Sequence, residues 1–146
     1  MSLYFDTTYI GKCYLNEPAA AEVRKLAQSV AGVNTSALAL AEMSCAFHRN
    51  LREGTLTPAT ERAARQQFLE DIENETWILQ PVTDKILRQV EVLSRKLPRQ
   101  SFLRAGDAIH VVSAMDAGFQ EIWTNDRHLL AAAEHFGIKG RQVASA

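Results

Sequence analysis

Four acidic residues of this 146-residue chain are candidates for chemistry: Asp6, Glu42, Asp107 and Asp126. Asp107 raises the sharpest question, because it opens the stretch "DAIHVVSAM", which is otherwise almost entirely apolar. A helix that is apolar on nearly every face is normally buried. An ionised carboxylate is costly to bury unless a positive or hydrogen-bonding group meets it. The partner of Asp107 is therefore the first thing to explain.

Taken singly, each acid has a simpler structural interpretation. Asp6 and Asp126 could cap the helices that follow them. Asp107 could interact favourably with a helix N-terminus, and Glu42 could point into water. If the four lie together, these interpretations weaken, because neighbouring carboxylates repel one another. No lysine or arginine occupies an apolar position from which it would neutralise them. Hard divalent cations bind oxygen ligands, so the four acids are predicted to hold Mg²⁺ or Mn²⁺.

The elements that must position these acids alternate between strand and helix. Apolar stretches predict strands at 3–5, 32–36, 76–80, 121–124 and 139–143, and helical patterns occupy 16–30, 36–53, 57–72, 83–97, 107–118 and 125–137. Alternation of this kind is typical of a parallel sheet covered on both faces. The sequence therefore predicts one three-layer α/β/α domain over residues 1–146, with a central, mainly parallel sheet of four to five short strands and more helix than strand.

This arrangement brings the acids to one edge of the sheet. In open parallel sheets, sites form beyond the carboxyl ends of the strands. Asp6 follows the first strand, and Asp126 lies two residues after the stretch 121–124. Asp107 opens a helix that returns toward the same edge. Glu42 shares a helix face, predicted to point at the core, with residues 38, 41 and 45.

Other polar residues near the acids have two possible roles. His110 stands three residues after Asp107, where a lone histidine is more often a packed, hydrogen-bonded residue than a ligand. The histidine spacing does not suggest zinc. Hydroxyl groups adjoin the acids and could cap helices or orient a metal-bound water: Thr7, Thr8 and Thr124. Arg104 and Arg127 flank the acids, either as solvated charges or as phosphate contacts.

Composition narrows the classes of function. The formal net charge is -1, which argues mildly against a large unaided nucleic-acid surface, although metal ions or a second chain could supply positive charge. The two cysteines have no metal-binding spacing, and no basic-then-apolar leader or run of about 18 apolar residues is present. These features predict a cytoplasmic protein with no membrane partner.

Four motifs resemble those of PIN-domain proteins: "YFDTTYIGKCYLNEP", "SALALAEMSCA", "RAGDAIHVVSA" and "WTNDRHLL". They occur in the order found in that family and span nearly the whole chain. The size and the Asn-Glu-Pro at 16–18 look most like VapC-type toxins of toxin–antitoxin operons. The resemblance implies metal-binding acids at Asp6, Glu42, Asp107 and Asp126, with Thr124 as hydroxyl support.

The resemblance also implies a function. A VapC-like chain would be a metal-dependent endoribonuclease that hydrolyses RNA with a metal-activated water, works as a homodimer and is inhibited by a small antitoxin. Two alternatives stay open. An aspartyl-phosphate phosphatase or phosphotransferase would also place an Asp after the first strand, but Thr8 stands where its second Asp is needed. A non-catalytic module could use the acidic pocket to dock a basic peptide.

The helices of residues 36–72 are more than one small sheet needs to cover itself. Apolar residues on or between them predict a two-fold homodimer interface: Leu51, Leu56, Phe68 and Leu69. The alternative is that all four belong to the domain's own core.

Overall fold

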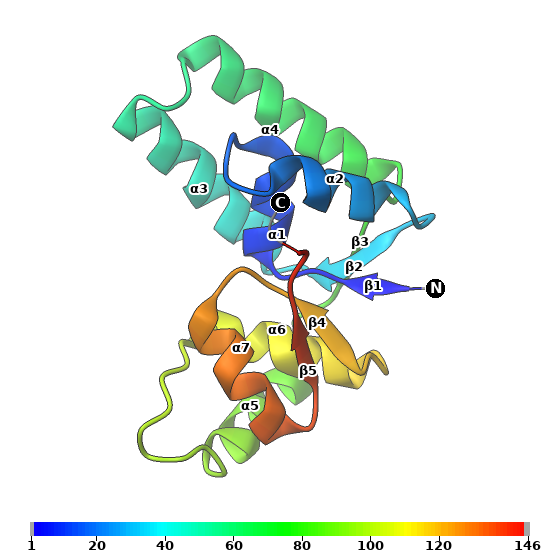
Figure 1. The fold of residues 1–146 in the computed structure, drawn as a ribbon, viewed down its shortest axis with the longest axis vertical. Coiled ribbons are helices and arrows are strands. Elements are labelled where there is room, and N and C mark those ends of the chain that lie inside the picture. The colour runs from blue at the N-terminus through cyan, green and yellow to red at the C-terminus, as the bar shows by residue number, and fades with distance from the viewer. Residues whose placement is uncertain (1, 145–146) are drawn as a thin grey trace.

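The computed structural model describes residues 2–144. Its elements follow the predicted alternation of strand and helix, and helix exceeds strand (Figure 1). In chain order they are β1 (Leu3–Tyr4), α1 (Thr7–Tyr14), α2 (Ala20–Gln28), β2 (Val33–Ser36), α3 (Ala39–Glu53), α4 (Pro58–Glu73), β3 (Trp77–Gln80), α5 (Asp84–Ser94), α6 (Ala105–Asp116), β4 (Glu121–Trp123), α7 (Arg127–Ala133), a 3₁₀ turn (Glu134–Phe136) and β5 (Lys139–Arg141).

All strand pairs are parallel. β1, β2 and β3 form one ladder in that order, and β4 pairs with β5 in a second. A parallel bridge between Phe5 and Trp123 joins the end of β1 to β4. The spatial order is therefore β3-β2-β1-β4-β5, which confirms the mainly parallel sheet. The chain leaves β1 toward β2 on one side and returns to its other side only with β4. The carboxyl end of β1 is thus a topological switch point, where open parallel sheets place their sites.

Helices cover both faces of the sheet, as predicted. Figure 1 shows α1–α4 on one side and α5–α7 on the other. Side chains alternate between the two cores along β1, because successive residues of a strand face opposite ways. Leu3 and Phe5 pack with Val33 under α1–α4, whereas Tyr4 packs with Ile122 under α5–α7. Among residues 2–144, no helix has the length and apolar content that crossing a bilayer requires.

The start of the chain differs from the predicted pattern. Residues 7–14 form a helix that side-chain periodicity does not indicate, since Thr, Tyr and Ile favour strands. Its N-terminus is specified instead by Asp6, whose side chain accepts the backbone N–H of Tyr9. The next helix begins at Ala20 rather than near residue 16, because Ala19 takes a left-handed backbone conformation with φ 64°.

The helix that carries Glu42 also begins later than predicted. Ser36 ends β2 and accepts a hydrogen bond from the backbone N–H of Leu38 at 3.1 Å, and α3 starts at Ala39. The predicted core-facing stripe of residues 38, 41, 42 and 45 is wrong. The buried face is Ala39, Met43 and Phe47, while Ala41 and Cys45 are exposed. Glu42 lies at the border of that face, which lets its carboxylate reach the sheet edge.

The apolar residues predicted on or between α3 and α4 divide between the domain's own core and its surface. Phe68 is buried in the domain's own core beside Phe47 and Tyr14, so its predicted place in a dimer interface is wrong. Leu56 packs partly against the same core. Leu69 is 53% exposed.

Candidate active site

Asp6 is held at the end of β1 by a set of hydrogen bonds. Its Oδ1 accepts from the Thr8 hydroxyl at 2.6 Å and from the backbone N–H of Tyr9 at 3.1 Å, and its Oδ2 accepts from the Thr124 hydroxyl. The side chain is 1% exposed. Burial raises the pKa of Asp6 above its usual range, and the His110 imidazole and these hydrogen bonds only partly offset that effect. The capping interpretation of Asp6 is confirmed, although a carboxylate has about four acceptor sites, so capping does not exhaust it.

Hydroxyl groups fasten the loop after β1 to the loop after β4. The fully buried Thr124 donates to Asp6, and its Oγ1 accepts the backbone N–H of Asp126 at 3.0 Å. In turn, Thr8 Oγ1 accepts the backbone N–H of Asn125 at 2.9 Å. Asp126 caps α7, with Oδ1 accepting from the backbone N–H groups of residues 128 and 129 at 2.7 and 3.2 Å. These contacts fix Asp6 and Asp126 at the same edge of the sheet.

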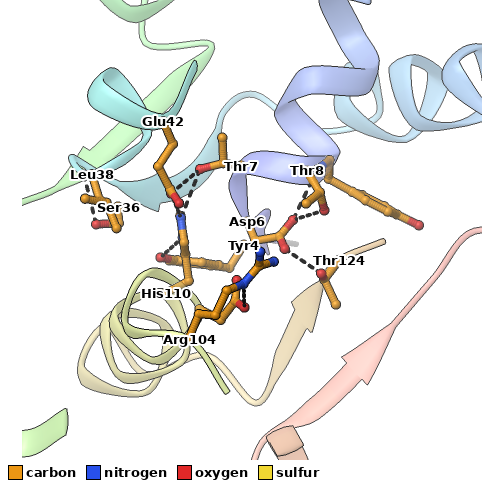
Figure 2. A network of polar contacts seen from close by, with 12 residues as sticks. Tyr4, Asp6, Thr7, Thr8, Ser36, Leu38, Glu42, Arg104, His110 and Thr124 are labelled. Carbon is orange, nitrogen blue, oxygen red and sulfur yellow. Dashed lines mark hydrogen bonds and ion pairs between the residues drawn. The ribbon is translucent and has the colours of Figure 1, made fainter. Parts of the chain in front are cut away.

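Glu42 belongs to a polar network that crosses between the two helical layers (Figure 2). Its Oε1 accepts from the Thr7 hydroxyl at 2.7 Å and lies 2.8 Å from His110 Nε2. His110 is 1% exposed, and its Nδ1 lies 3.1 Å from the Tyr4 hydroxyl. Because an ionised carboxylate only accepts hydrogen bonds, the Nε2–H group of His110 is the donor to Glu42. His110 is thus a packed, hydrogen-bonded residue, as predicted.

The charge of Glu42 is stabilised where that of Asp6 is not. Partial burial alone would raise the pKa of Glu42. The hydrogen bond from His110, the electrostatic effect of the same imidazole and the hydrogen bond from Thr7 together lower this pKa below its usual range. Gly106 makes room for this carboxylate. A Cβ at that position would stand 2.9 Å from Glu42 Oε2. Sequence reasoning missed Gly106, and the available signal was a glycine in the first turn of an apolar helix.

Asp107 meets an arginine. Arg104 Nε lies 3.5 Å from Asp107 Oδ2, and Arg104 Nη2 lies 3.0 Å from Asp126 Oδ2. The sequence predicts no cation at an apolar position near the acids, and Arg104 reaches them instead from an exposed position. Burial raises the pKa of Asp107, the charge of Asp126 raises it further, and Arg104 opposes both. The two carboxylates raise the pKa of Arg104, whose side chain is 65% exposed.

The acids open into a pocket of about 430 Å³ at the sheet edge. Asp6, Glu42 and Asp107 line it together with His110, and so do Thr7, Thr8, Arg49, Arg104, Gly106 and Asn125. Asp126 and Thr124 stand beside the pocket rather than in its lining, and Arg127 is exposed outside it. The structure therefore brings three predicted acids into one cavity and ties the fourth to it through Arg104.

The carboxylate oxygens of this pocket are ligands that suit a hard cation, and one of them lacks a hydrogen-bond partner among the described residues. Asp107 Oδ2 is buried and has no hydrogen-bond partner in the part of the chain that the structure describes, so its desolvation is uncompensated there apart from the ion pair at 3.5 Å. As the side chains stand, no three His, Cys, Asp or Glu residues between 2 and 144 form a ready metal cluster. The guanidinium of Arg104 lies between the Asp107 and Asp126 carboxylates, where a cation shared by these two acids would also lie.

The geometry agrees with a comparison against protein families. The family described as the PIN domain matches residues 3–135 of this chain. This chain belongs to the PIN-domain family. PIN domains are typically metal-dependent nucleases that act on RNA or DNA, and a mainly parallel sheet between helices is their fold. A comparison with curated proteins finds no match to the chain. The PIN resemblance of the four motifs is confirmed, and nuclease activity follows as the general expectation for this PIN domain.

Proposed function

We propose that this PIN domain is a metal-dependent endoribonuclease and the toxin of a type II toxin–antitoxin pair. The observation that carries the nuclease proposal is the Asp107 carboxylate. Its Oδ2 is buried and without a hydrogen bond in the cavity that Asp6 and Glu42 also line. Three carboxylates around one cavity supply the oxygen donors that Mg²⁺ and Mn²⁺ prefer.

In this proposal Asp6, Glu42, Asp107 and Asp126 hold Mg²⁺ or Mn²⁺, and Thr124 supports Asp6. A bound divalent ion would supply Lewis-acid stabilisation of the phosphate and a water of lowered pKa. The hydroxyl groups of Thr7, Thr8 and Thr124 keep the acids in place. Arg104 is mostly exposed, so it can leave the acids and pair with an RNA phosphate. Arg49 lines the same pocket and offers a second phosphate contact.

Cleavage of total RNA tests the nuclease proposal. The purified chain with Mg²⁺ or Mn²⁺ should produce fragments bearing 5′-phosphate and 3′-hydroxyl ends, and EDTA should stop the reaction. Glu42→Gln should abolish cleavage. Glu53→Gln is the matched control, because Glu53 lies on the same helix but is exposed, and between residues 2 and 144 its one ion pair is with Arg52 at 3.8 Å. Intact RNA after incubation of the wild-type chain with either metal would leave the acidic docking module as the better proposal.

The aspartyl-phosphate alternative is disfavoured by Thr8, which stands where such an enzyme needs its second Asp. The Thr8 hydroxyl instead donates to Asp6 Oδ1 at 2.6 Å and cannot act as that carboxylate.

The toxin proposal needs a test in cells. Expression of the chain alone should arrest growth, and Asp6→Ala should relieve the arrest while the protein stays folded. Co-expression of the neighbouring gene should restore growth if it encodes the antitoxin. An antitoxin arginine could bind the acids as Arg104 binds Asp107 and Asp126 here. Normal growth with soluble wild-type chain would remove the toxin proposal and leave the nuclease proposal standing.

We also propose a homodimer through α3 and α4. Leu69 carries this proposal, because it is 53% exposed on α4 whereas Phe68 is buried. Light scattering should give the mass of two chains for the wild type and of one chain for Leu69→Asp.

A further inference from the structure

The loop between α5 and α6 concentrates positive charge in a chain whose net charge is -1. Residues 95–104, which we name the basic arm, read "RKLPRQSFLR" and contain four cations and no acid. The arm has no regular secondary structure and leads directly into α6, whose first turn carries Asp107 (Figure 1). The last residue of the arm, Arg104, contacts the site acids and connects the arm to the pocket.

Two leucines fix the arm to the domain and turn its charges outward. Leu97 and Leu103 pack against the core under α5–α7. Of the four cations, Arg95 pairs with Glu91 at 2.7 Å, and Arg104 pairs with the site acids. Lys96 and Arg99 are exposed and have no ion pair with any residue between 2 and 144. These two charges are therefore available to bind an anionic partner.

Phe102 gives the arm an exposed aromatic ring beside the site. It is 53% exposed, although Leu103 next to it is packed inward. Its ring centroid lies 4.6 Å from that of His128, tilted by 53°. The backbone N–H of His128 donates to Asp126 Oδ1 at 2.7 Å, so two direct contacts connect the Phe102 ring with a site carboxylate. A single exposed phenylalanine needs no explanation by itself. Phe102 follows two free cations in the chain and contacts a residue next to the site, and an exposed aromatic face of this kind is one on which an unpaired base can stack.

We propose that the basic arm binds a single-stranded stretch of the RNA substrate, with a base stacked on Phe102 and backbone phosphates paired with Lys96 and Arg99. This inference rests on the proposed ribonuclease function and names residues outside the acidic pocket that hold the RNA. Stacking on a side chain requires a base that is not paired in a duplex, because paired bases present only their edges. The arm therefore selects single strands, loops or bulges over continuous duplex.

Fluorescence anisotropy with a labelled single-stranded RNA and the matched duplex tests the inference. All proteins carry Asp107→Asn, so that the RNA stays intact with Mg²⁺ present. Phe102→Ala should weaken single-strand binding about fivefold or more, and Phe102→Trp should retain affinity, because stacking on one aromatic side chain is worth that much. Lys96→Ala with Arg99→Ala should lower the slope of log K against log salt by about 1.4, roughly 0.7 for each lost phosphate contact.

Arg24→Ala with Lys25→Ala is the matched control. Both residues are exposed cations on α2, in the opposite helical layer, and their loss should leave the slope unchanged. Unchanged affinity in Phe102→Ala, or duplex bound as tightly as single strand, overturns the inference. Cleavage by the wild-type chain is measured separately. Cleavage without any effect of the arm variants would leave the nuclease proposal and remove the arm, whereas binding through the arm without cleavage would do the reverse.

Discussion

Arg104 joins two carboxylates that come from different ends of the site, with Nη2 at 3.0 Å from Asp126 Oδ2 and Nε at 3.5 Å from Asp107 Oδ2. The guanidinium thus supplies positive charge where the proposed divalent ion would supply it. Both cannot make the same contacts at once, so Arg104 and the metal compete for the acids. Because the arginine side chain is 65% exposed, giving up its contacts costs little.

Removal of Arg104 should therefore separate its stabilisation of the metal-free protein from its competition with the metal. Arg104→Ala should lower the melting temperature of the metal-free protein by about 1–3 °C, since an exposed ion pair contributes less than about 1 kcal/mol. The rise in melting temperature on adding Mn²⁺ should be larger than in the wild type, because the acids no longer have an internal partner. Arg127→Ala, an exposed arginine outside the pocket, should change neither value. A smaller Mn²⁺ effect in Arg104→Ala would contradict the competition.

Asp107 should stabilise the protein only when a cation is bound. Ligand at a hundredfold excess over its dissociation constant adds about 2.7 kcal/mol to the free energy of unfolding. Asp107→Asn should lose most of that gain. Without metal the same variant should be more stable than the wild type. Burial and Asp126 raise the pKa of Asp107 above its ordinary value, so its ionised form destabilises the folded state at neutral pH.

Thermal melts with and without Mn²⁺ measure both effects. Asp116→Asn is the matched control, because Asp116 lies at the other end of α6 and pairs with Lys85 at 3.1 Å on the surface. If Mn²⁺ shifts the melting temperature of Asp107→Asn as far as that of the wild type, Asp107 does not hold the ion.

The buried histidine should control where Glu42 points. His110→Ala should weaken Mn²⁺ binding by about 10- to 100-fold, since loss of a partner that orients a metal-binding carboxylate typically has that effect. His110→Gln can keep an N–H group near the place of Nε2, and it should recover part of the affinity. Calorimetric titration gives the affinity, and circular dichroism checks that each variant is folded. Wild-type affinity in His110→Ala would show that Thr7 alone positions Glu42.

The parts of the site that depend on chain topology could be predicted from the sequence. Asp6 and Asp126 lie within three residues of the ends of parallel strands, and parallel strands end at one edge, so their proximity follows from the alternation of strand and helix alone. Glu42 and Asp107 are also identified from the residues, as acids in otherwise apolar helical stretches, and the family motifs support both; Asp107 lies in the first turn of its helix, as predicted. Periodicity puts Glu42 on a buried stripe with residues 38, 41 and 45, whereas the structure places it at the border of a different buried face, formed by Ala39, Met43 and Phe47.

The features of the site that depend on the reach of a long side chain, or on the space beside a glycine, could not be predicted from the sequence. Arg104 can reach either solvent or Asp126, and only the fold decides which acids lie within its range. The helix after Asp6 is not among the predicted elements because its β-branched and aromatic residues favour a strand, although its N-cap residue, Asp6, is a predicted cap candidate. Gly106 escaped because its importance lies in the space it leaves for a residue 64 positions away, Glu42.

That space leads to a variant in which stability and activity should separate. Gly106 lies in the first turn of α6 and does not have the positive φ that only glycine tolerates well, so alanine fits its backbone. Gly106→Ala should leave the free energy of unfolding unchanged or raise it by up to about 1 kcal/mol, because alanine favours helix over glycine. The new Cβ would stand 2.9 Å from Glu42 Oε2, which is too close, and the flexible carboxylate must move away.

A displaced Glu42 should cost activity, since small misplacements of a reacting group reduce rates steeply. We expect RNA cleavage by Gly106→Ala to fall roughly 10-fold or more, with no loss in melting temperature. Gly11→Ala is the matched control. Gly11 is helical and lines the same pocket, but a Cβ there would meet its neighbours at ordinary distances of 3.8–3.9 Å. Gly11→Ala should therefore cleave RNA at a rate near that of the wild type. Equal cleavage rates for the two alanine variants would mean that the position of Glu42 does not limit the reaction.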